Sequence, residues 1–284
     1  MSKIVLVTGA STGLGASISV QAASNGHKVY ATMRDPSTGV GPEQAAQALG
    51  VSLEILALDV QDTTSVNAAV ATVIEREGRI DVLVNNAGTG FARSTEQASL
   101  EDIERIMDVN FMGVVRATKA VLPHMRRARS GHIINISSVG GLVGQPFNEV
   151  YCAAKFAVEG YTEALASYVQ PSFGIMFTAV EPGGIHSEFA NSAMKQIAST
   201  GGLLEDEYLP LIQKYLASAR ERAAIAYQTS DAVAAVVMHC MESNDPPVRV
   251  RTSAWANDLC ELKTSADPDG KKLQKKVVNM FLGG

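Results

Sequence analysis

Short, nearly unbroken apolar runs alternate with longer stretches of helical spacing over the first 185 residues. The apolar runs are rich in Val, Ile and Leu and lack strict polar alternation, which is typical of strands buried on both faces. They predict strands over 3–8, 28–33, 53–58, 80–85, 131–137 and 174–180. The stretches between them predict helices over 13–25, 62–77, 100–128 and 149–171.

Repeated strand–helix units of this kind predict a parallel sheet covered by helices on both faces. The fold class is therefore α/β, a Rossmann-type doubly wound sheet. No low-complexity linker or long repeat divides the chain, so we expect a single domain over residues 1–284, with its core in 1–185. After the core, residues 186–228 predict inserted helices. The C-terminal part, 229–284, predicts a helix over 229–243, an edge strand at 248–252 and a polar tail with a short helix over 258–282.

Composition excludes several classes of function. The net charge of −5 without a basic run that could follow a phosphate backbone argues against nucleic acid as a partner. The apolar run at residues 3–7 is too short for a signal-peptide core or a membrane span, so we expect no membrane partner. Three widely spaced cysteines suit a reducing, cytoplasmic compartment, and five histidines without paired ligand spacing indicate no metal site. Lysines at 271, 272, 275 and 276 indicate a solvated helix face, with docking of an acidic partner as the alternative.

A glycine-rich loop follows the first predicted strand directly. Gly9, Gly13 and Gly15 let the backbone turn tightly and approach a pyrophosphate, and the helix that follows offers free N–H groups and a partial positive charge. Ser11 and Thr12 add hydroxyl donors. The alternative is an ordinary glycine-rich turn, because this spacing differs from the common Gly-x-Gly-x-x-Gly fingerprint.

The end of the second strand predicts the cofactor. A carboxylate there would bind a free ribose diol, but Met33 occupies that position and Arg34 follows it. An arginine fits a 2′-phosphate through charge-assisted bonds, which favours NADP(H) over NAD(H). Asp35, which precedes a proline, is interpreted as the start of a turn.

The end of the third strand offers a contact to the adenine. Asp59, followed by Val60, could accept a hydrogen bond from the adenine amino group. The alternative is that Asp59 caps the next helix, a role for which Asp62 is better placed.

Tyr151 and Lys155 are the candidate proton-transfer pair. Four residues apart on a helix, they lie on one face, and a nearby ammonium lowers the pKa of a phenol. Ser138, at the end of the fifth strand, could donate a hydrogen bond to a substrate oxygen beside the phenol. Its neighbour Ser137 is an equal candidate from strand alternation, and both serines could instead cap the next turn.

Taken together, these residues resemble the short-chain dehydrogenase/reductase family, in its short single-domain branch. The resemblance covers about residues 3–190 and rests on the glycine loop, Asp59, Asn85–Gly88, Asn110, Ser138, Tyr151, Lys155 and Pro182–Gly183 in this order. It implies that Asn110 holds a water in a relay with Ser138, Tyr151 and Lys155. The family's thirteen-residue spacing between serine and tyrosine selects Ser138 over Ser137.

The resemblance also implies a set of cofactor contacts. Asn86 would lie against the cofactor, and the 182–187 turn would contact the nicotinamide amide, with Ser187 where the family usually has threonine. We expect cofactor contacts from Gly9, Ser11, Thr12, Gly13, Leu14, Gly15, Arg34, Asp59, Val60, Asn86, Ala87, Gly88, Tyr151, Lys155, Pro182, Gly183, Ile185 and Ser187.

The stretch from Ser137 to Gly160 is similar to the branch that holds 17β-hydroxysteroid and retinol dehydrogenases and many bacterial ketoreductases. That similarity implies NADP(H), a helical substrate region, a C-terminal extension and a homodimer or homotetramer. We therefore expect reversible hydride transfer to a hydrophobic ketone or aldehyde, giving an alcohol. The alternatives are a non-catalytic dinucleotide sensor or scaffold, an epimerase or dehydratase, and an NAD-dependent alcohol dehydrogenase.

Residues 188–228 predict a lid over a bulky apolar substrate, with a hinge at Gly201–Gly202. Phe189, Met194, Ile197, Leu203 and Leu204 would supply its apolar surface. The alternative is a permanently packed pair of helices.

Overall fold

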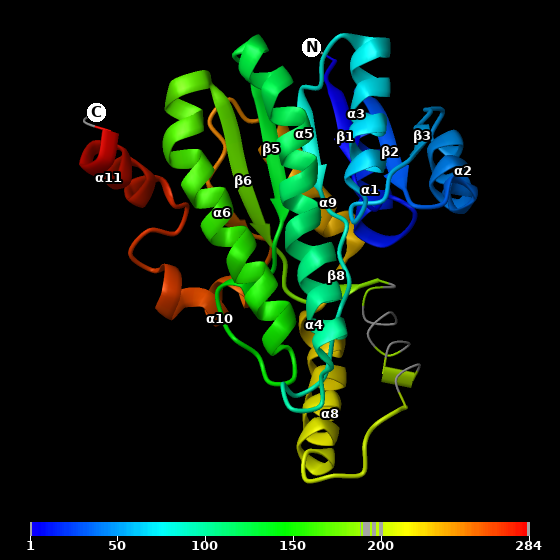
Figure 1. The fold of residues 1–284 in the computed structure, drawn as a ribbon, viewed down its shortest axis with the longest axis vertical. Coiled ribbons are helices and arrows are strands. Elements are labelled where there is room, and N and C mark those ends of the chain that lie inside the picture. The colour runs from blue at the N-terminus through cyan, green and yellow to red at the C-terminus, as the bar shows by residue number, and fades with distance from the viewer. Residues whose placement is uncertain (1, 188, 190–193, 195–196, 199–200, 283–284) are drawn as a thin grey trace.

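A seven-stranded parallel sheet with helices on both faces organises the protein (Figure 1). The computed structural model describes residues 2–187, 189, 194, 197–198 and 201–282. The sheet consists of β1 (Ile4–Val7), β2 (Lys28–Met33), β3 (Glu54–Ala57), β4 (Val82–Asn85), β5 (Gly131–Ile136), β6 (Ile175–Glu181) and β9 (Arg249–Arg251). The predicted α/β Rossmann fold is confirmed.

The strand order is β3-β2-β1-β4-β5-β6-β9. From β1 the chain moves outward to β3, returns to the other side of β1 as β4, and continues to β6. The order therefore reverses between β1 and β4. Open α/β sheets bind their ligands at such a switch point, beyond the carboxyl ends of the strands.

Both faces of the sheet are buried, which explains its continuous apolar runs. Leu6, Leu83 and Phe177 face one cluster, with side chains of α3 (Thr63–Glu77), α5 (Gly113–Ala128) and α6 (Glu149–Phe173). Their neighbours Val5 and Val84 face the other cluster, with α1 (Gly13–Ser24) and α9 (Ser230–Glu242). Figure 1 shows α5 and α6 in front of the sheet and α9 behind it. Because successive strand residues point to opposite faces, neither face could be polar.

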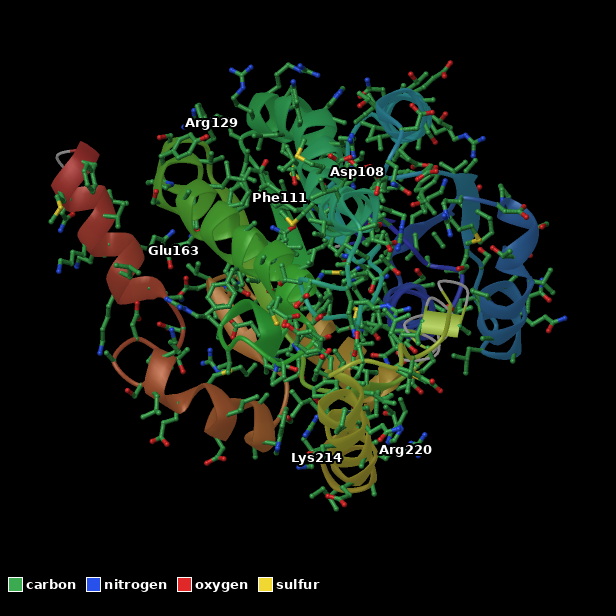
Figure 2. All side chains as sticks on the ribbon, turned by 60° about the horizontal axis from the view of Figure 1, so that its bottom comes forward. Asp108, Phe111, Arg129, Glu163, Lys214 and Arg220 are labelled. Atoms are coloured by element: carbon green, nitrogen blue, oxygen red, sulfur yellow. The ribbon has the colours of Figure 1, made fainter. Side chains whose placement is uncertain are left out.

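The helix predicted over 100–128 is divided into three parts. These are α4 (Leu100–Met107), a π-helical turn (Asp108–Met112) and α5. Figure 2 shows Phe111 at this turn, and its ring meets a tyrosine of α6 edge-on, with 6.0 Å between the ring centroids. The turn places Asn110 fully inside the protein. Single π turns inside α-helices are frequent at functional sites.

Two predictions outside the core require correction. The segment before β3 forms a helical turn (Pro36–Gly39) and α2 (Val40–Ala48), neither of which we predicted. Its sequence contains Gly and Pro and lacks a regular apolar face, so periodicity gives no signal. The tail over 258–282 contains two helices, α10 (Ala254–Thr264) and α11 (Lys271–Leu282), instead of one.

The predicted lid is described only in part. Its second half forms α8 (Leu209–Ala226), which leads to a two-stranded pairing of β7 (Ile185–His186) with β8 (Gln228–Thr229). Several residues of its first half lie outside the described residues, so the lid stays a prediction. In the described part of the chain, no helix has the length and apolarity needed to cross a membrane.

A chain of buried amides ties the middle of the sheet to two helices. Asn85 Nδ2 donates to Asn135 Oδ1 at 2.8 Å and to Thr118 Oγ1 on α5 at 3.2 Å. Asn135 Nδ2 then donates to Thr162 Oγ1 on α6 at 2.8 Å. All four side chains are buried, so each lost bond would leave a polar group without water.

We expect Asn135→Ala to lower the free energy of unfolding by about 2–4 kcal/mol, because it opens a cavity and removes an acceptor and a donor from buried partners. Urea unfolding would measure the loss. The control is Asn67→Ala on the exposed side of α3, which should change stability by less than about 0.5 kcal/mol. Equal losses in the two variants would contradict the prediction.

Candidate active site

The glycine loop after β1 has a backbone that only glycine allows. Gly9 and Gly13 have positive φ angles of 66° and 56°. A Cβ atom at Gly9 would lie 2.7 Å from Ala87 Cα, and one at Gly15 would lie 2.3 Å from the Gly9 carbonyl oxygen. Side chains at these positions would fill the loop, so its bare backbone is left to face a ligand.

The segment after β4 holds this loop in place. Thr8 Oγ1 accepts from the backbone N–H groups of Asn86 at 3.0 Å and Ala87 at 3.1 Å. Asn86 Nδ2 donates to the carbonyl oxygens of Thr8 at 3.0 Å and Gly9 at 2.9 Å. Asn86 therefore shapes the cradle, and its contact with the cofactor stays a prediction. Thr8 is a supporting residue that the sequence analysis missed.

The start of α1 fits a phosphate group. Thr12 occupies the N-cap position, but its side chain caps none of the first N–H groups of the helix. Thr12 is exposed and Ser11 is partly exposed, whereas Leu14 packs into the core. Uncapped N–H groups and the helix dipole attract anions, so these residues fit the pyrophosphate of a dinucleotide.

The end of β2 supports the interpretation of Arg34 and Asp35. Met33 is buried and Arg34 is exposed. Asp35 accepts a hydrogen bond from the Ser37 N–H at 2.9 Å and so begins the following turn. Its carboxylate is engaged locally, and Arg34 is the side chain left at the strand end.

The two aspartates after β3 have separate roles. Asp62 Oδ1 accepts from the Thr64 N–H at 2.8 Å and caps α3. Asp59 Oδ1 accepts from the Gln61 N–H at 3.0 Å, so it does not cap the helix. Val60 is buried beside Asp59.

Tyr151, Lys155 and Ser138 meet where β5 ends. Lys155 Nζ lies 5.8 Å from the centroid of the Tyr151 ring and donates to the Ile136 carbonyl oxygen at 2.8 Å. Ser138 Oγ accepts from the Gly140 N–H at 3.0 Å, and its hydrogen bond to Tyr151 lowers the pKa of the phenol. The structure therefore brings the three predicted catalytic groups together.

Burial dominates the ionisation of this group. It raises the pKa of Tyr151 to about 12 and lowers the pKa of Lys155 to about 8. The direction for Tyr151 is opposite to our expectation, because removal of the phenol from water outweighs its hydrogen bond to Ser138. The chain alone therefore holds Tyr151 as a neutral phenol.

Asn110 lies beside this group but is occupied by backbone contacts. Its Oδ1 accepts from the Thr89 N–H at 3.1 Å, and its Nδ2 donates to the carbonyl oxygens of Thr89 and Ile106, both at 3.0 Å. A Cβ atom at Gly88 would lie 2.8 Å from Asn110 Oδ1 and 3.8 Å from Lys155 Nζ. These contacts fix the backbone next to Lys155. The water relay through Asn110 stays a prediction.

The turn after β6 connects the glycine loop to the proton-transfer group. The Pro182 carbonyl oxygen accepts from the Val139 N–H, at 2.9 Å, next to Ser138. A Cβ atom at Gly13 would lie 3.3 Å from Ser187 Cβ. Gly183 packs against the Trp255 ring, and Ile185 begins β7.

Aromatic rings lie near Tyr151. Phe189 lies 5.6 Å from Tyr151 between ring centroids, and Tyr215 of α8 lies 5.9 Å from Phe147. Within the described residues, no three His, Cys, Asp or Glu side chains gather as a metal site. The candidate site thus joins one phenol, one hydroxyl and one amine, with an aromatic ring against the phenol.

Comparisons with known proteins support this arrangement. A family described as short chain dehydrogenase matches residues 3–198. The chain belongs to this family. It is 39% identical to retinol dehydrogenase 8 of Bos taurus over 274 residues, covering 94% of the chain and 86% of the relative. It is 38% identical to 17-beta-hydroxysteroid dehydrogenase type 1 of Homo sapiens over 273 residues, covering 94% and 82%.

A solved structure of an actinorhodin polyketide ketoreductase variant with NADPH is also similar. It has a TM-score of 0.77 and 27% identity, and the match covers 90% of this chain and 98% of that one. The predicted family resemblance is thereby confirmed. The protein is an oxidoreductase that interconverts a carbonyl and an alcohol with a nicotinamide dinucleotide.

Gly9→Ala should abolish dinucleotide binding, because the new Cβ atom would force Ala87 and the loop apart. Nicotinamide fluorescence on titration with NADPH would measure binding. The control is Gly26→Ala, which also has a positive φ angle but open space around it. It should cost about 1–2 kcal/mol of stability and leave binding intact. Retained binding in Gly9→Ala would contradict the assignment of the cradle.

Proposed function

We propose that this protein is an NADP(H)-dependent oxidoreductase that reversibly reduces a hydrophobic ketone or aldehyde to an alcohol. The observation that carries the proposal is the meeting of Ser138, Tyr151 and Lys155 beside a loop suited to a pyrophosphate. All three catalytic groups are present, which favours an enzyme over a sensor or scaffold.

The bound nicotinamide would supply or accept the hydride. Tyr151 gives its proton to the developing alkoxide oxygen in reduction and recovers it in alcohol oxidation. Ser138 Oγ accepts from Gly140, and its O–H, which forms the hydrogen bond with Tyr151, would turn to donate to the substrate oxygen. Lys155 faces Tyr151 and would hold the nicotinamide ribose, and Asn110 would complete the proton relay.

The direction of the Tyr151 pKa suits reduction. A general acid must be protonated at the start of the step, and a pKa of about 12 keeps the phenol protonated at neutral pH. Alcohol oxidation requires the opposite, an ionised phenol. The positive charge of an oxidised nicotinamide would lower the pKa of Tyr151 and so allow that direction.

Exposed Arg34 at the end of β2 supports the choice of NADP(H). Its guanidinium is available for the 2′-phosphate, while Asp35 is engaged in its own turn. The similar ketoreductase was solved with NADPH. We keep an NAD-dependent alcohol dehydrogenase as the alternative.

The aromatic surroundings of Tyr151 support an apolar substrate, in line with relatives named for retinol and a hydroxysteroid. The lid over 188–228 would close over that substrate. Exposed Phe156 on α6 supports a homodimer or homotetramer. We propose a cytoplasmic location for the enzyme.

Tyr151→Phe should lower kcat for ketone reduction by about 10²–10⁴-fold, because it removes only the oxygen that transfers the proton. NADPH binding and the unfolding transition should persist. The control is Tyr168→Phe, an exposed tyrosine of the same helix, which should keep full activity. Most of the turnover surviving in Tyr151→Phe would exclude this residue as the acid.

Arg34→Ala should weaken NADPH binding by about 1.5–3 kcal/mol and leave NADH binding nearly unchanged. Fluorescence titration with each cofactor gives both dissociation constants. Arg76→Ala, at an exposed site on α3, serves as the control and should change neither. Equal losses for the two cofactors would show that Arg34 does not bind the 2′-phosphate.

Ser138→Ala should lower kcat more than Ser137→Ala, because only the Ser138 hydroxyl forms a hydrogen bond with Tyr151. Steady-state kinetics with one ketone at saturating NADPH would compare them. The reverse order would move the catalytic serine by one residue.

A further inference from the structure

A second group of ionisable residues lies behind the catalytic residues, on the side of α6 that faces β6 and β9. Glu159 of α6, Glu181 at the end of β6 and Ser137 after β5 each bury a side-chain oxygen that has no hydrogen-bond partner among the described residues. Glu181 is fully buried and Ser137 is 3% exposed. Ser137 and Glu181 both act on Glu159, since each shifts the pKa of its carboxyl group, and a proton held between the two carboxyl groups would give their buried oxygens a partner.

The positive charges nearby do not balance two carboxylates. Arg251 of β9 pairs with Glu181 at 2.9 Å, with side chains that are 5% and 0% exposed. Arg249 lies 3.6 Å from Glu163 and 4.0 Å from Asp267, and its positive charge also lowers the pKa of Glu159 and Glu181. Arg251 is thus the arginine paired directly with a site in which both carboxyl groups bury an oxygen, and an uncompensated buried charge is strongly unfavourable.

A shared proton resolves this imbalance. Burial and the negative charge of Glu181 raise the pKa of Glu159 well above its ordinary value. Burial also raises the pKa of Glu181, but Arg251 opposes this. Glu159 is therefore the member of the pair that holds a proton more tightly, and Glu181 is the member that ionises first. Two carboxyl groups in one site cannot both ionise easily and titrate as a pair.

Backbone hydrogen bonds connect the segment around Glu181 to the segment around Ser138. The residues on either side of Glu181 bind the residues on either side of Ser138, through Ser137 N to Val180 O at 2.7 Å and Val139 N to Pro182 O at 2.9 Å. A displacement of Glu181 would therefore move the catalytic serine.

The pair also reaches Lys155. Glu159 follows Lys155 by one helical turn on α6. A Cβ atom at Gly141 would lie 2.7 Å from Ser137 Oγ, 3.0 Å from Glu159 Cγ and 3.0 Å from the Lys155 carbonyl oxygen. The turn after β5, the pair and the catalytic helix thus pack without spare space.

We propose that Glu159 and Glu181 share one proton and that this pair, held by Arg251, positions Ser138 and Lys155 for Tyr151. Both glutamates are positioning residues, and their effect on catalysis rests on the proposed function. The proton matters because a carboxylate at Glu159 raises the pKa of Lys155 and would draw its ammonium away from the phenol. Two ionised carboxylates would also repel, separating α6 from β6.

The shared proton can be tested without activity. Glu159→Gln copies the protonated carboxyl group, and Glu163→Gln, one turn further along α6 and partly exposed, is the matched control (Figure 2). The pKa of an unfolded-state Glu is about 4.3, and the folded pKa is higher, so the folded state keeps a proton that the unfolded state releases. Raising the pH between these two pKa values therefore favours unfolding of the wild type.

Urea unfolding of the three proteins would be measured from about pH 5 to about pH 8. The unfolding constant of the wild type should rise relative to that of Glu159→Gln by up to about tenfold per pH unit, and Glu163→Gln should follow the wild type. Equal slopes for the wild type and Glu159→Gln would overturn the shared proton. If Glu163→Gln also lost the pH dependence of its unfolding constant, the proton could not be assigned to Glu159 and Glu181.

The positioning role has its own readout. In Glu159→Gln, the limb of the kcat–pH profile that reports Tyr151 and Lys155 should move to lower pH by roughly 0.5–1 unit, because wild-type Glu159 loses its proton along this alkaline limb and then raises the pKa of Lys155, which an amide cannot do. The profile of Glu163→Gln should not move. An unchanged profile in Glu159→Gln would overturn the positioning role. A wild type inactive on every ketone would contradict the proposed function instead, and the unfolding experiment would still decide the shared proton.

Discussion

The hydrogen bond from Lys155 Nζ to the Ile136 carbonyl oxygen is the contact on which the active site depends. It joins the catalytic helix α6 to the end of β5, with a buried amine as the donor. Because a buried cationic group requires a partner, this bond fixes where α6 lies along the strand. Tyr151, one turn earlier on α6, and Ser138, two residues after Ile136, are brought together by this alignment.

The same burial determines the chemistry of the site. It holds Tyr151 neutral, with a pKa of about 12, and lowers the pKa of Lys155 to about 8. The protein thus provides a protonated acid, and an ionised Tyr151 requires the charge that a bound dinucleotide brings. Behind the site, the pair of Glu159 and Glu181 limits the negative charge near Lys155. Burial therefore shifts the pKa values of the ionisable groups on both sides of α6, Tyr151 and Lys155 on one side and Glu159 and Glu181 on the other.

The sequence predicted the core strands because they are buried on both faces, which leaves unbroken apolar runs such as residues 3–8. It predicted Tyr151 and Lys155 because helical spacing is local. It could not predict α2, whose residues lack a regular apolar face, or the support that Thr8 gives to the glycine loop. The pair of Glu181 and Arg251 is separated by 70 residues, and only the fold joins them. The raised pKa of Tyr151 likewise depends on burial, which its local sequence does not encode.

The central claim is that Tyr151 is neutral in the chain alone and becomes a usable base only when an oxidised dinucleotide is bound. The most direct measurement is an ultraviolet titration of tyrosine ionisation, taken as the difference between the wild type and Tyr151→Phe, with and without saturating NADP⁺. The account predicts that this phenol ionises above the free-phenol pKa of about 10 in the chain alone and below it with NADP⁺. The same pKa under both conditions would contradict the account.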